Sequence, residues 1–235
     1  MREFVAFRLW GDYAHFSHPA TIYSSLTYPI PPKTAIMGFL GALIGEEEPF
    51  RLGDIKYSIK LEQPLVKKQF VFNGIKFALS SNMHLKEGYQ DASEKKQFYR
   101  ELICNPSYKV FVDLKELKKE YKEQIIDALK FHKTKFTPYL GINFCIADFE
   151  WIEIKEIEKK EDEVCKIDSF TLKKDFIFEA NINTRLTTAR MACGVEEGRI
   201  FKDFKDFVIE INANKISSKN SNNIFRIDKD VIYFV

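Results

Sequence analysis

The feature that most constrains the fold is the stretch TYPIPPKTAIMGFLGALIG at residues 27–45, where a proline pair and one lysine precede an apolar run. Pro31 and Pro32 restrict φ and suit the first turn of a helix. The run that follows is apolar on nearly every side, which predicts a helix over residues 33–43 that is buried on most of its faces. It is much shorter than the roughly 20 residues that cross a bilayer, so we expect no membrane span.

Glycines interrupt this predicted helix and end it. Gly38 and Gly41 each cost about 1 kcal/mol of helix propensity relative to alanine, so we expect another backbone to pass close to them. Gly45 is predicted to be the left-handed residue that ends the helix. A phosphate-binding P-loop needs its lysine directly after the second glycine, whereas Lys33 and Thr34 precede both glycines, which excludes that motif. Two interpretations stay open: these two residues contact a phosphate at the helix N-terminus, or they only begin a buried helix.

The order of predicted elements indicates a fold class. Alternating apolar and polar residues predict strands over residues 3–10, 55–61, 66–72, 108–112 and 142–157. A second, amphipathic helix is predicted over residues 113–131, with Asp113 as its N-cap. Asn73-Gly74 is a hairpin signal, and a short helix is predicted at residues 95–103. The resulting β-α-β-β-α-β order is that of the ferredoxin-like split βαβ fold, which RNA-binding modules of the RRM type share.

The last third of the chain reads differently. A lysine- and glutamate-rich stretch at residues 153–163 looks like a solvated boundary. Short antiparallel strands are predicted beyond it, over residues 165–172, 176–182, 207–211 and 224–235. We therefore expect an α+β chain with a ferredoxin-like domain over residues 1–157, an insertion at about 78–106, and a small antiparallel β-rich unit over residues 164–235.

Charge and cysteine content exclude several classes of protein. The formal net charge is only +2, but residues 60–135 hold 16 Lys and Arg against 10 Asp and Glu, and residues 146–179 hold 6 against 11. A local basic face is therefore expected rather than a strongly basic protein. The four cysteines lack the spacing of a zinc site, and we expect no metal or cofactor. Unpaired cysteines and a charged N-terminus without a signal-peptide core predict a cytoplasmic protein.

Two segments near the N-terminus resemble a known family. The segments FRLWGDYAHF at residues 7–16 and SSLTYPIPPKTAIMGFLGALIG at residues 24–45 resemble the N-terminus of the CRISPR-associated RAMP superfamily. Within it they are most similar to the Cas family five subunit of type I interference (Cascade) complexes. The segment PYLG at residues 138–141, placed before a predicted strand, makes the type I-B group the most similar. The C-terminal third resembles the family only loosely.

This resemblance implies a function in antiviral defence. It implies a non-catalytic RNA-binding subunit that holds and caps the 5′ handle of the CRISPR RNA (crRNA) and contacts the backbone and large subunits. Such contacts are usually made through a protruding β-hairpin thumb, for which residues 78–106 are the candidate. In one subtype of the family the subunit is itself a metal-independent endoribonuclease that uses Tyr, His and Lys, whereas in the type I-B group a separate enzyme usually cuts the RNA.

The candidate site residues follow from chemistry. RNA binding needs cations for phosphates, aromatic rings for unstacked bases, and hydroxyl or amide groups for the 2′-OH. The residues that offer this mixture are Ser24, Tyr28, Lys33, Thr34, Lys67, Lys68, Arg185 and Arg190. Metal-free RNA cleavage needs a base, an acid and a cation, and the alternative set for that reaction is His132, Lys133 and Tyr139. A glycine-containing segment at residues 193–199 is too acidic for a phosphate cradle and argues against the nuclease.

A third interpretation belongs to a different class: a ferredoxin-like protein-interaction module without an RNA role. It predicts no salt-dependent binding to handle RNA. The sequence alone keeps all three functions open.

Overall fold

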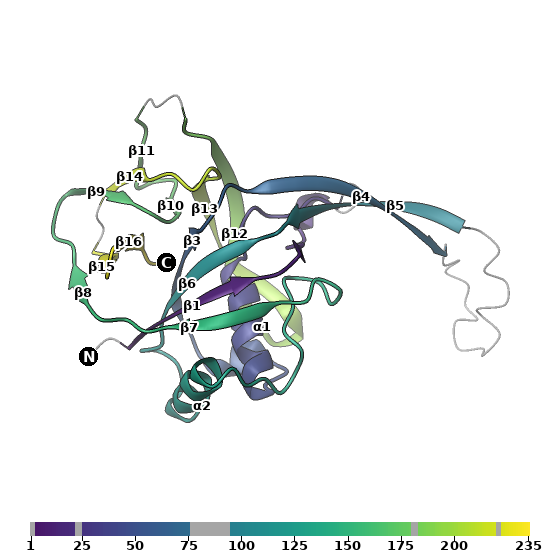
Figure 1. Ribbon diagram of the computed structural model, residues 1–235, viewed down its shortest axis with the longest axis horizontal. Coiled ribbons are helices and arrows are strands. Elements are labelled where there is room, and N and C mark those ends of the chain that lie inside the picture. The colour runs from purple at the N-terminus through teal and green to yellow at the C-terminus, as the bar shows by residue number, and fades with distance from the viewer. Residues whose placement is uncertain (1–2, 22–24, 76–94, 180–182, 220–221) are drawn as a thin grey trace.

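The computed structural model describes residues 3–21, 25–75, 95–179, 183–219 and 222–235 (Figure 1). Its centre is a four-stranded sheet in which all neighbouring strands are antiparallel. In spatial order these strands are β3 (Lys56–Leu61), β6 (Ser107–Asp113), β1 (Phe4–Trp10) and β7 (Asp148–Ile152). β1 and β3 lie inside predicted strands, and β6 extends the predicted strand 108–112 by one residue at each end, so these three predictions are confirmed. The strand predicted over 142–157 is confirmed only at β7, because residues 142–147 form turns and an isolated bridge.

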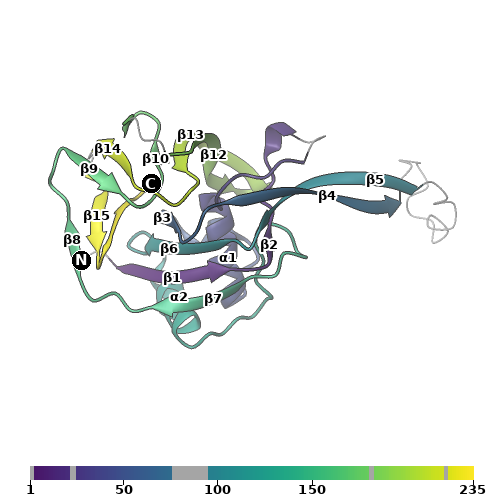
Figure 2. The same cartoon turned by 45° about the horizontal axis from the view of Figure 1, so that its top comes forward.

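Two α-helices cover one face of this sheet (Figures 1 and 2). Helix α1 (Lys33–Ile44) connects β1 to β3, and α2 (Lys119–Lys130) connects β6 to β7. Phe39 of α1 stacks on Phe7 of β1 at 5.3 Å between ring centroids and meets Phe149 of β7 edge-on at 5.5 Å. The helices and this face of the sheet therefore share one apolar core.

The opposite face of the sheet is covered by the end of the chain. Ala6 of β1 and Phe111 of β6 are fully buried in a second apolar cluster with Phe225, Ile232 and Phe234. These three residues belong to a small sheet and the C-terminal residues that follow it. The strands of that sheet are β16 (Asp230–Tyr233), β15 (Ile224–Ile227) and β8 (Ile157–Lys159). A base therefore cannot stack on the sheet at these positions.

A charged network joins the same two layers. Lys60 of β3 and Lys109 of β6 face each other in the sheet, and both donate to the carboxylate of Asp230, at 2.6 and 2.7 Å. Lys60 lies 3.4 Å from a second carboxylate, that of Asp168, which also accepts the Val231 N–H. Asp230 is 1% exposed. The network thus fixes how β16 lies across β3 and β6.

Six more strands, all after residue 163, form two further three-stranded sheets, β11-β14-β9 and β10-β13-β12. Their bounds are β9 (Val164–Ile167), β10 (Thr171–Leu172), β11 (Phe176–Ile177), β12 (Leu186–Glu196), β13 (Ile200–Glu210) and β14 (Ile216–Lys219). Strand β12 contacts α1, and Met191 and Cys193 belong to the main core. The main core therefore crosses the proposed boundary between the two units, and the division at about residue 160 stays a prediction.

A two-stranded arm extends from the body (Figures 1 and 2). It consists of β4 (Val66–Ile75) and β5 (Lys95–Cys104), and the short β2 (Tyr13–Ala14) pairs with the base of β5. The helix predicted at residues 95–103 is therefore wrong. Asn73-Gly74 is not a turn either, because it lies inside β4 opposite Gln97 and Lys96. The residues of the predicted insertion at 78–94 lie outside the described residues.

The second helix starts later than predicted. Asp113 is the last residue of β6, where it pairs with both Phe4 and Lys56, and its carboxylate accepts the N–H of Lys115. The N-cap of α2 is Lys118, which makes no side-chain capping bond. The prediction of Asp113 as the cap was wrong because the same side chain instead closes the turn that leaves the strand. Three short 3₁₀ helices complete the described elements: η1 (Pro19–Thr21), η2 (Pro49–Leu52) and η3 (Glu197–Arg199).

The apolar run of the opening stretch forms α1 as predicted. Gly45 ends the helix in the left-handed conformation, with φ of 82°, and its N–H bonds to the carbonyl of Gly41. Within the described residues no helix is long and apolar enough to cross a membrane. The α+β class is confirmed, with two α-helices and many antiparallel strands among the described residues.

The two glycines of α1 have different surroundings, which gives a direct test. A Cβ at Gly41 would lie 2.7 Å from the carbonyl oxygen of Glu46, whereas a Cβ at Gly38 would have no atom of a described residue within 4 Å. The expected close backbone therefore exists at Gly41 and not at Gly38. We expect Gly38→Ala to raise the free energy of unfolding by about 0.5–1 kcal/mol, and Gly41→Ala to lower it by about 1–2 kcal/mol. Urea unfolding of both variants measures this, and equal effects would contradict the packing described.

Candidate nucleic-acid interface

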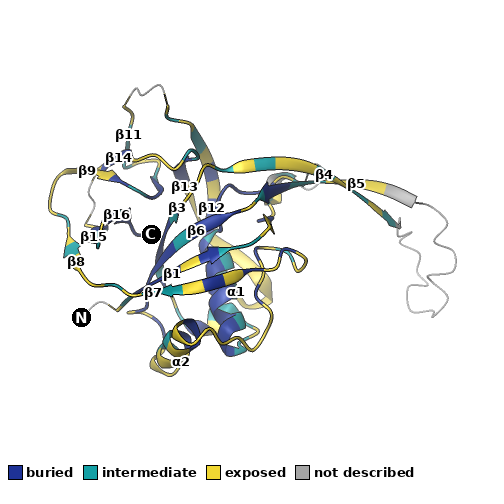
Figure 3. Cartoon of the chain, in the orientation of Figure 1, coloured by how far each residue is buried: buried dark blue, intermediate teal, exposed yellow. Residues whose placement is uncertain are grey.

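The arm presents two different faces because side chains alternate along paired strands. Phe70 lies directly opposite Arg100, and Phe72 lies opposite Phe98. Lys68 follows the same alternation, so these five side chains share one face, which we call the aromatic face. Figure 3 shows that most of the arm is exposed, whereas the central sheet and α1 are mostly buried.

Rings from the body extend the aromatic face at its base. Tyr13 of β2 meets Phe70 edge-on at 5.3 Å, and Phe144 lies 5.6 Å from Phe72. The Arg100 guanidinium lies 5.8 Å from the centroid of Phe144. Phe98 and Phe144 remain 44% and 48% exposed. Partly exposed rings beside a guanidinium are the groups on which unstacked bases bind.

Gly74 has a packing role on this face. A Cβ there would lie 2.7 Å from the ring of Phe98, so the glycine leaves room for this ring to cover the neighbouring strand. Asn73-Gly74 signals a hairpin turn in the sequence, but in the structure its glycine makes space for the ring of Phe98.

Lys67, a predicted RNA ligand, lies on the other face and holds the arm to the body. Its ammonium donates to the carbonyl of Thr27 at 2.7 Å and to the carboxylate of Glu101 at 2.9 Å. His15 hydrogen-bonds the Glu101 carbonyl at 2.8 Å, and burial lowers the pKa of this histidine. Lys68 is exposed and, within the described ranges, makes no ion pair. Of the two lysines, Lys68 is therefore the one available to a ligand.

The residues that precede α1 are largely occupied by packing. Lys33 is 5% exposed and pairs with Asp54 at 2.6 Å. Thr34 is half-buried in the first turn of α1, whose N-cap is Pro32. Tyr28 is buried, its hydroxyl donates to the carbonyl of Arg190 at 2.6 Å, and burial raises its pKa. The contacts at this predicted RNA-binding segment are thus with the protein itself, and Ser24 lies outside the described residues.

The two predicted arginines, Arg185 and Arg190, have different surroundings. The side chain of Arg190 points outward from β12 and lies 3.5 Å from Asp206 on the facing strand. Arg185 is exposed, and in the described part of the chain its guanidinium makes no ion pair. It lines a hollow of about 590 Å³ together with Asn183 and Asn212. The structure links Tyr28 to Arg190 through the backbone but brings neither residue to the aromatic face.

The alternative catalytic residues are not gathered into one site. His132 has a φ of 51°, its ring stacks on Phe149 at 4.4 Å, and its Nε2 lies 3.2 Å from a carboxylate oxygen of Asp148. The ammonium of Lys133 lies over the ring of Phe131, and Tyr139 is half exposed. Among the described residues, the side chains of His132, Lys133 and Tyr139 make no hydrogen bond or ring contact with one another. The glycine-containing segment at residues 193–199 runs from the end of β12 through the turn to β13.

Sequence reasoning missed Phe72, Phe98 and Arg100 on the aromatic face, and Tyr13 and Phe144, which extend it. The signal that could have found Phe98 and Arg100 is their spacing of two within KKQFYRELIC, which places them on one side of a strand. The same segment also satisfies helical spacing, because Phe98 and Leu102 are four apart. The position of Phe144 next to Phe72 carries no local signal.

Comparison with known proteins places this chain in a family. The family described as CRISPR-associated protein (Cas_Cas5) matches residues 4–196. A solved structure described as a CRISPR protein from Archaeoglobus fulgidus has a TM-score of 0.58 at 11% identity, with 99% of this chain and 98% of that chain covered.

A chain of a CRISPR RNA-guided surveillance complex has a TM-score of 0.55 at 13% identity, with 92% and 91% covered. No curated protein sequence matches this chain. At these identities the two structures show a shared fold, whereas the family match spans most of the chain. This protein therefore belongs to the CRISPR-associated Cas5 family.

Proposed function

We propose that this chain is a non-catalytic subunit of a type I CRISPR effector complex that holds the 5′ handle of the crRNA on the aromatic face of its arm. The observation that carries this proposal is the set of partly exposed rings, Phe72, Phe98 and Phe144, beside the Arg100 guanidinium. Proteins bind single-stranded RNA with aromatic side chains on which bases stack and a positively charged groove that follows the backbone. On the aromatic face Lys68 and Arg100 supply the cations, and such a local groove is compatible with a net charge of only +2.

The central sheet supports the assignment to the RAMP superfamily. The order β3-β6-β1-β7, with α1 and α2 as the two crossovers, is the order expected of a ferredoxin-like β-α-β-β-α-β core. An RRM stacks bases on the uncovered face of such a sheet. Here Ala6 and Phe111 on that face are buried under the C-terminal residues. In this proposal the arm provides the stacking surface instead.

The other face of the arm suits a protein partner. Val71 and Tyr99 lie opposite each other there and are 52% and 51% exposed. Their neighbours Gln69, Asn73 and Gln97 are uncharged and exposed. Interfaces between proteins favour aromatic residues and few charges at their centre. We propose that this face contacts the backbone or large subunit while the aromatic face holds RNA.

The nuclease alternative rests on His132, Lys133 and Tyr139, and its support in the structure is the contact between His132 and Asp148. A carboxylate beside a histidine can orient the ring for proton transfer. However, Lys133 and Tyr139 do not contact this pair among the described residues, so the reaction would lack an arranged acid and cation. The geometry thus favours binding over cleavage.

Ribonuclease footprinting of the assembled complex tests the proposed function. We expect the 5′ handle to be protected when this subunit is present and cleaved when the complex is prepared without it. An unprotected handle in the intact complex would show that the proposal is wrong. Incubation of the protein alone with repeat RNA and a chelator separates the alternative, because His132→Ala should then abolish any cleavage.

A further inference from the structure

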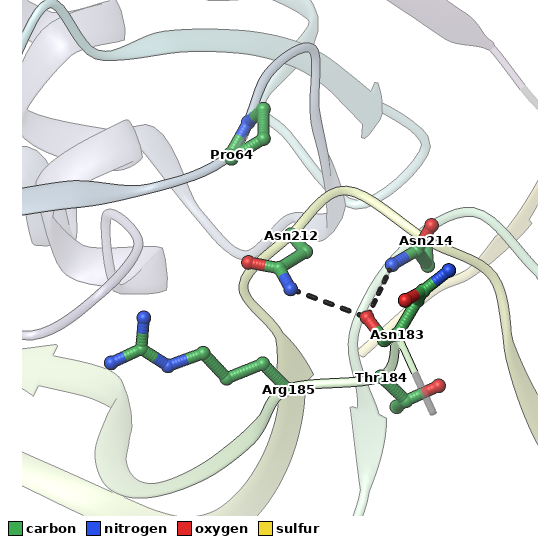
Figure 4. A pocket seen from close by; sticks show the side chains of 6 residues that line it. All are labelled: Pro64, Asn183, Thr184, Arg185, Asn212 and Asn214. Carbon is green, nitrogen blue, oxygen red and sulfur yellow. Dashed lines mark hydrogen bonds between the residues drawn. The ribbon is translucent and has the colours of Figure 1, made fainter. Parts of the chain in front are cut away.

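A second polar site lies at the root of the arm, away from the aromatic face. Figure 4 shows this hollow of about 590 Å³. The segment just before β4 borders it, because Leu65 donates its N–H to the carbonyl of Ile211 at 2.7 Å. The residues that line it are Pro64, Asn183, Thr184, Arg185, Asn212 and Asn214. Its volume lies within the range of ordinary small-ligand sites.

A buried carboxylate, that of Glu210, fixes the backbone around this hollow. Glu210, the last residue of β13, is 5% exposed. It accepts the backbone N–H groups of Arg185 at 2.9 Å, Asn212 at 3.0 Å and Asn214 at 2.5 Å. A single side chain thereby holds both the segment before β12 and the segment after β13 in place, so the hollow is preformed.

The amide side chains inside are oriented by one backbone oxygen. The Nδ2 atoms of Asn212 and Asn214 both donate to the carbonyl of Asn183, at 3.2 and 3.0 Å (Figure 4). Each side-chain oxygen is left as an acceptor, and the oxygen of Asn212 lies on the side of Arg185 (Figure 4). The site therefore offers oriented acceptors in a hollow that Arg185 also lines, and the Arg185 guanidinium makes no ion pair within the described residues.

A second hollow adjoins the first. It has a volume of about 210 Å³ and shares Thr184 and Asn214 with its neighbour. Lys166, Lys215 and the half-buried ring of Phe176 line it as well. Lys166 pairs with Glu179, which also lines this hollow, at 3.7 Å, and Lys215 pairs with Asp168 at 3.1 Å. Because Lys166 and Glu179 are both exposed, their pair is weak and a phosphate can compete with the carboxylate for this lysine.

We propose that these adjoining hollows bind two consecutive nucleotides of single-stranded RNA. A phosphate would bind the Arg185 guanidinium, and the ribose 2′-OH groups would donate to the side-chain oxygens of Asn212 and Asn214. Because DNA lacks this donor, the site selects RNA. The inference rests on the proposed function and deepens it, since it names a second RNA contact beside the arm.

Fluorescence anisotropy with the full chain tests this site. The probes are a labelled unstructured ten-nucleotide RNA and the DNA of the same sequence, at fixed salt. We expect Arg185→Ala to weaken RNA binding about tenfold. The matched control is Arg51→Ala, which removes an exposed arginine that does not line the hollows and should change the affinity less than twofold.

The double variant Asn212→Ala/Asn214→Ala tests the selection of RNA. We expect it to lower RNA affinity about fivefold and DNA affinity less than twofold, with an unchanged melting temperature because Glu210 keeps its backbone partners. Unchanged RNA binding in Arg185→Ala, or an unchanged ratio of RNA to DNA affinity in the double variant, would overturn the inference.

The arm variant Phe72→Ala/Phe98→Ala separates this inference from the proposed function. If it loses RNA binding while Arg185→Ala binds like the wild type, the polar site is wrong and the proposed function stands. If the wild-type chain binds neither probe, both fail.

Discussion

Replacing Asp230 by asparagine is expected to lower the free energy of unfolding by about 3–5 kcal/mol. The carboxylate is almost fully buried and accepts hydrogen bonds from the ammonium groups of Lys60 and Lys109. Asparagine keeps the shape of the side chain but leaves two poorly solvated cations without their shared counterion. Loss of this contact should loosen the C-terminal strands from the central sheet.

The same variant should change how stability depends on pH. Burial alone would raise the pKa of Asp230, but hydrogen bonds from Lys109 and Lys60 outweigh it and hold the pKa below its ordinary value. A group with a lowered pKa in the folded state contributes stability above its unfolded pKa, and this contribution is lost as the pH falls through the folded value. The difference between wild type and Asp230→Asn should therefore be full above about pH 5 and shrink at lower pH.

Urea unfolding from pH 3 to pH 7 measures both effects. Glu163→Gln is the control, since it removes an exposed carboxylate from the same third of the chain and should change stability by less than about 0.5 kcal/mol. An Asp230→Asn protein within about 1 kcal/mol of the wild type at pH 7 would contradict the role assigned to this network.

The second large effect is expected at the arm. Phe72→Ala/Phe98→Ala removes two rings that lie opposite each other on the aromatic face. Stacking contributes about 1–3 kcal/mol per base, so we expect affinity for handle RNA to fall about 30-fold or more. Phe98 is 44% exposed, but Phe72 packs against the main core, so we expect a modest fall in the melting temperature and compare binding well below it.

The next rung of the arm supplies the control. Val71→Ala/Tyr99→Ala removes a directly opposed pair that faces the other way and is 52% and 51% exposed. Anisotropy with labelled handle RNA should separate the two double variants by at least about tenfold. Equal losses in both would show that the arm does not present one RNA-binding face. In the proposed function, the control variant should instead weaken assembly with the partner subunits.

Local sequence patterns correctly predicted the elements whose conformation depends mainly on neighbouring residues. The apolar run after Pro32 is too hydrophobic to lie at the surface and too short for a membrane, so it could only become a buried helix such as α1. Gly45 ends that helix because it adopts positive φ without strain. The alternation in β1 likewise predicts a strand with a buried side. These predictions need no knowledge of distant residues.

Other predictions failed where two local signals compete. The segment that forms β5 satisfies both helical and strand spacing, and only its pairing with β4 decides between them. Asn73-Gly74 signals a turn, but the ring of Phe98 uses the space at Gly74 and the strand continues. Asp113 suits a helix cap, but it ends β6 and closes a turn.

For the candidate site too, the sequence predicted one part and the tertiary structure decided the other. Residue types alone selected Lys33, Lys67 and Arg185, because a cation is visible in the sequence. Whether that cation is available depends on carboxylates far away in the chain: Lys33 pairs with Asp54 and Lys67 with Glu101, whereas Arg185 makes no ion pair within the described residues.

The sequence by itself determined where the two α-helices and most of the strands lie, and it carried the family resemblance. Periodicity and short motifs are local features of the sequence. Only the tertiary structure decided that β4 and β5 pair and that the chain end covers the sheet. It also decided that Arg100 lies beside Phe144. These features depend on register and on contacts between distant segments, which no local pattern specifies.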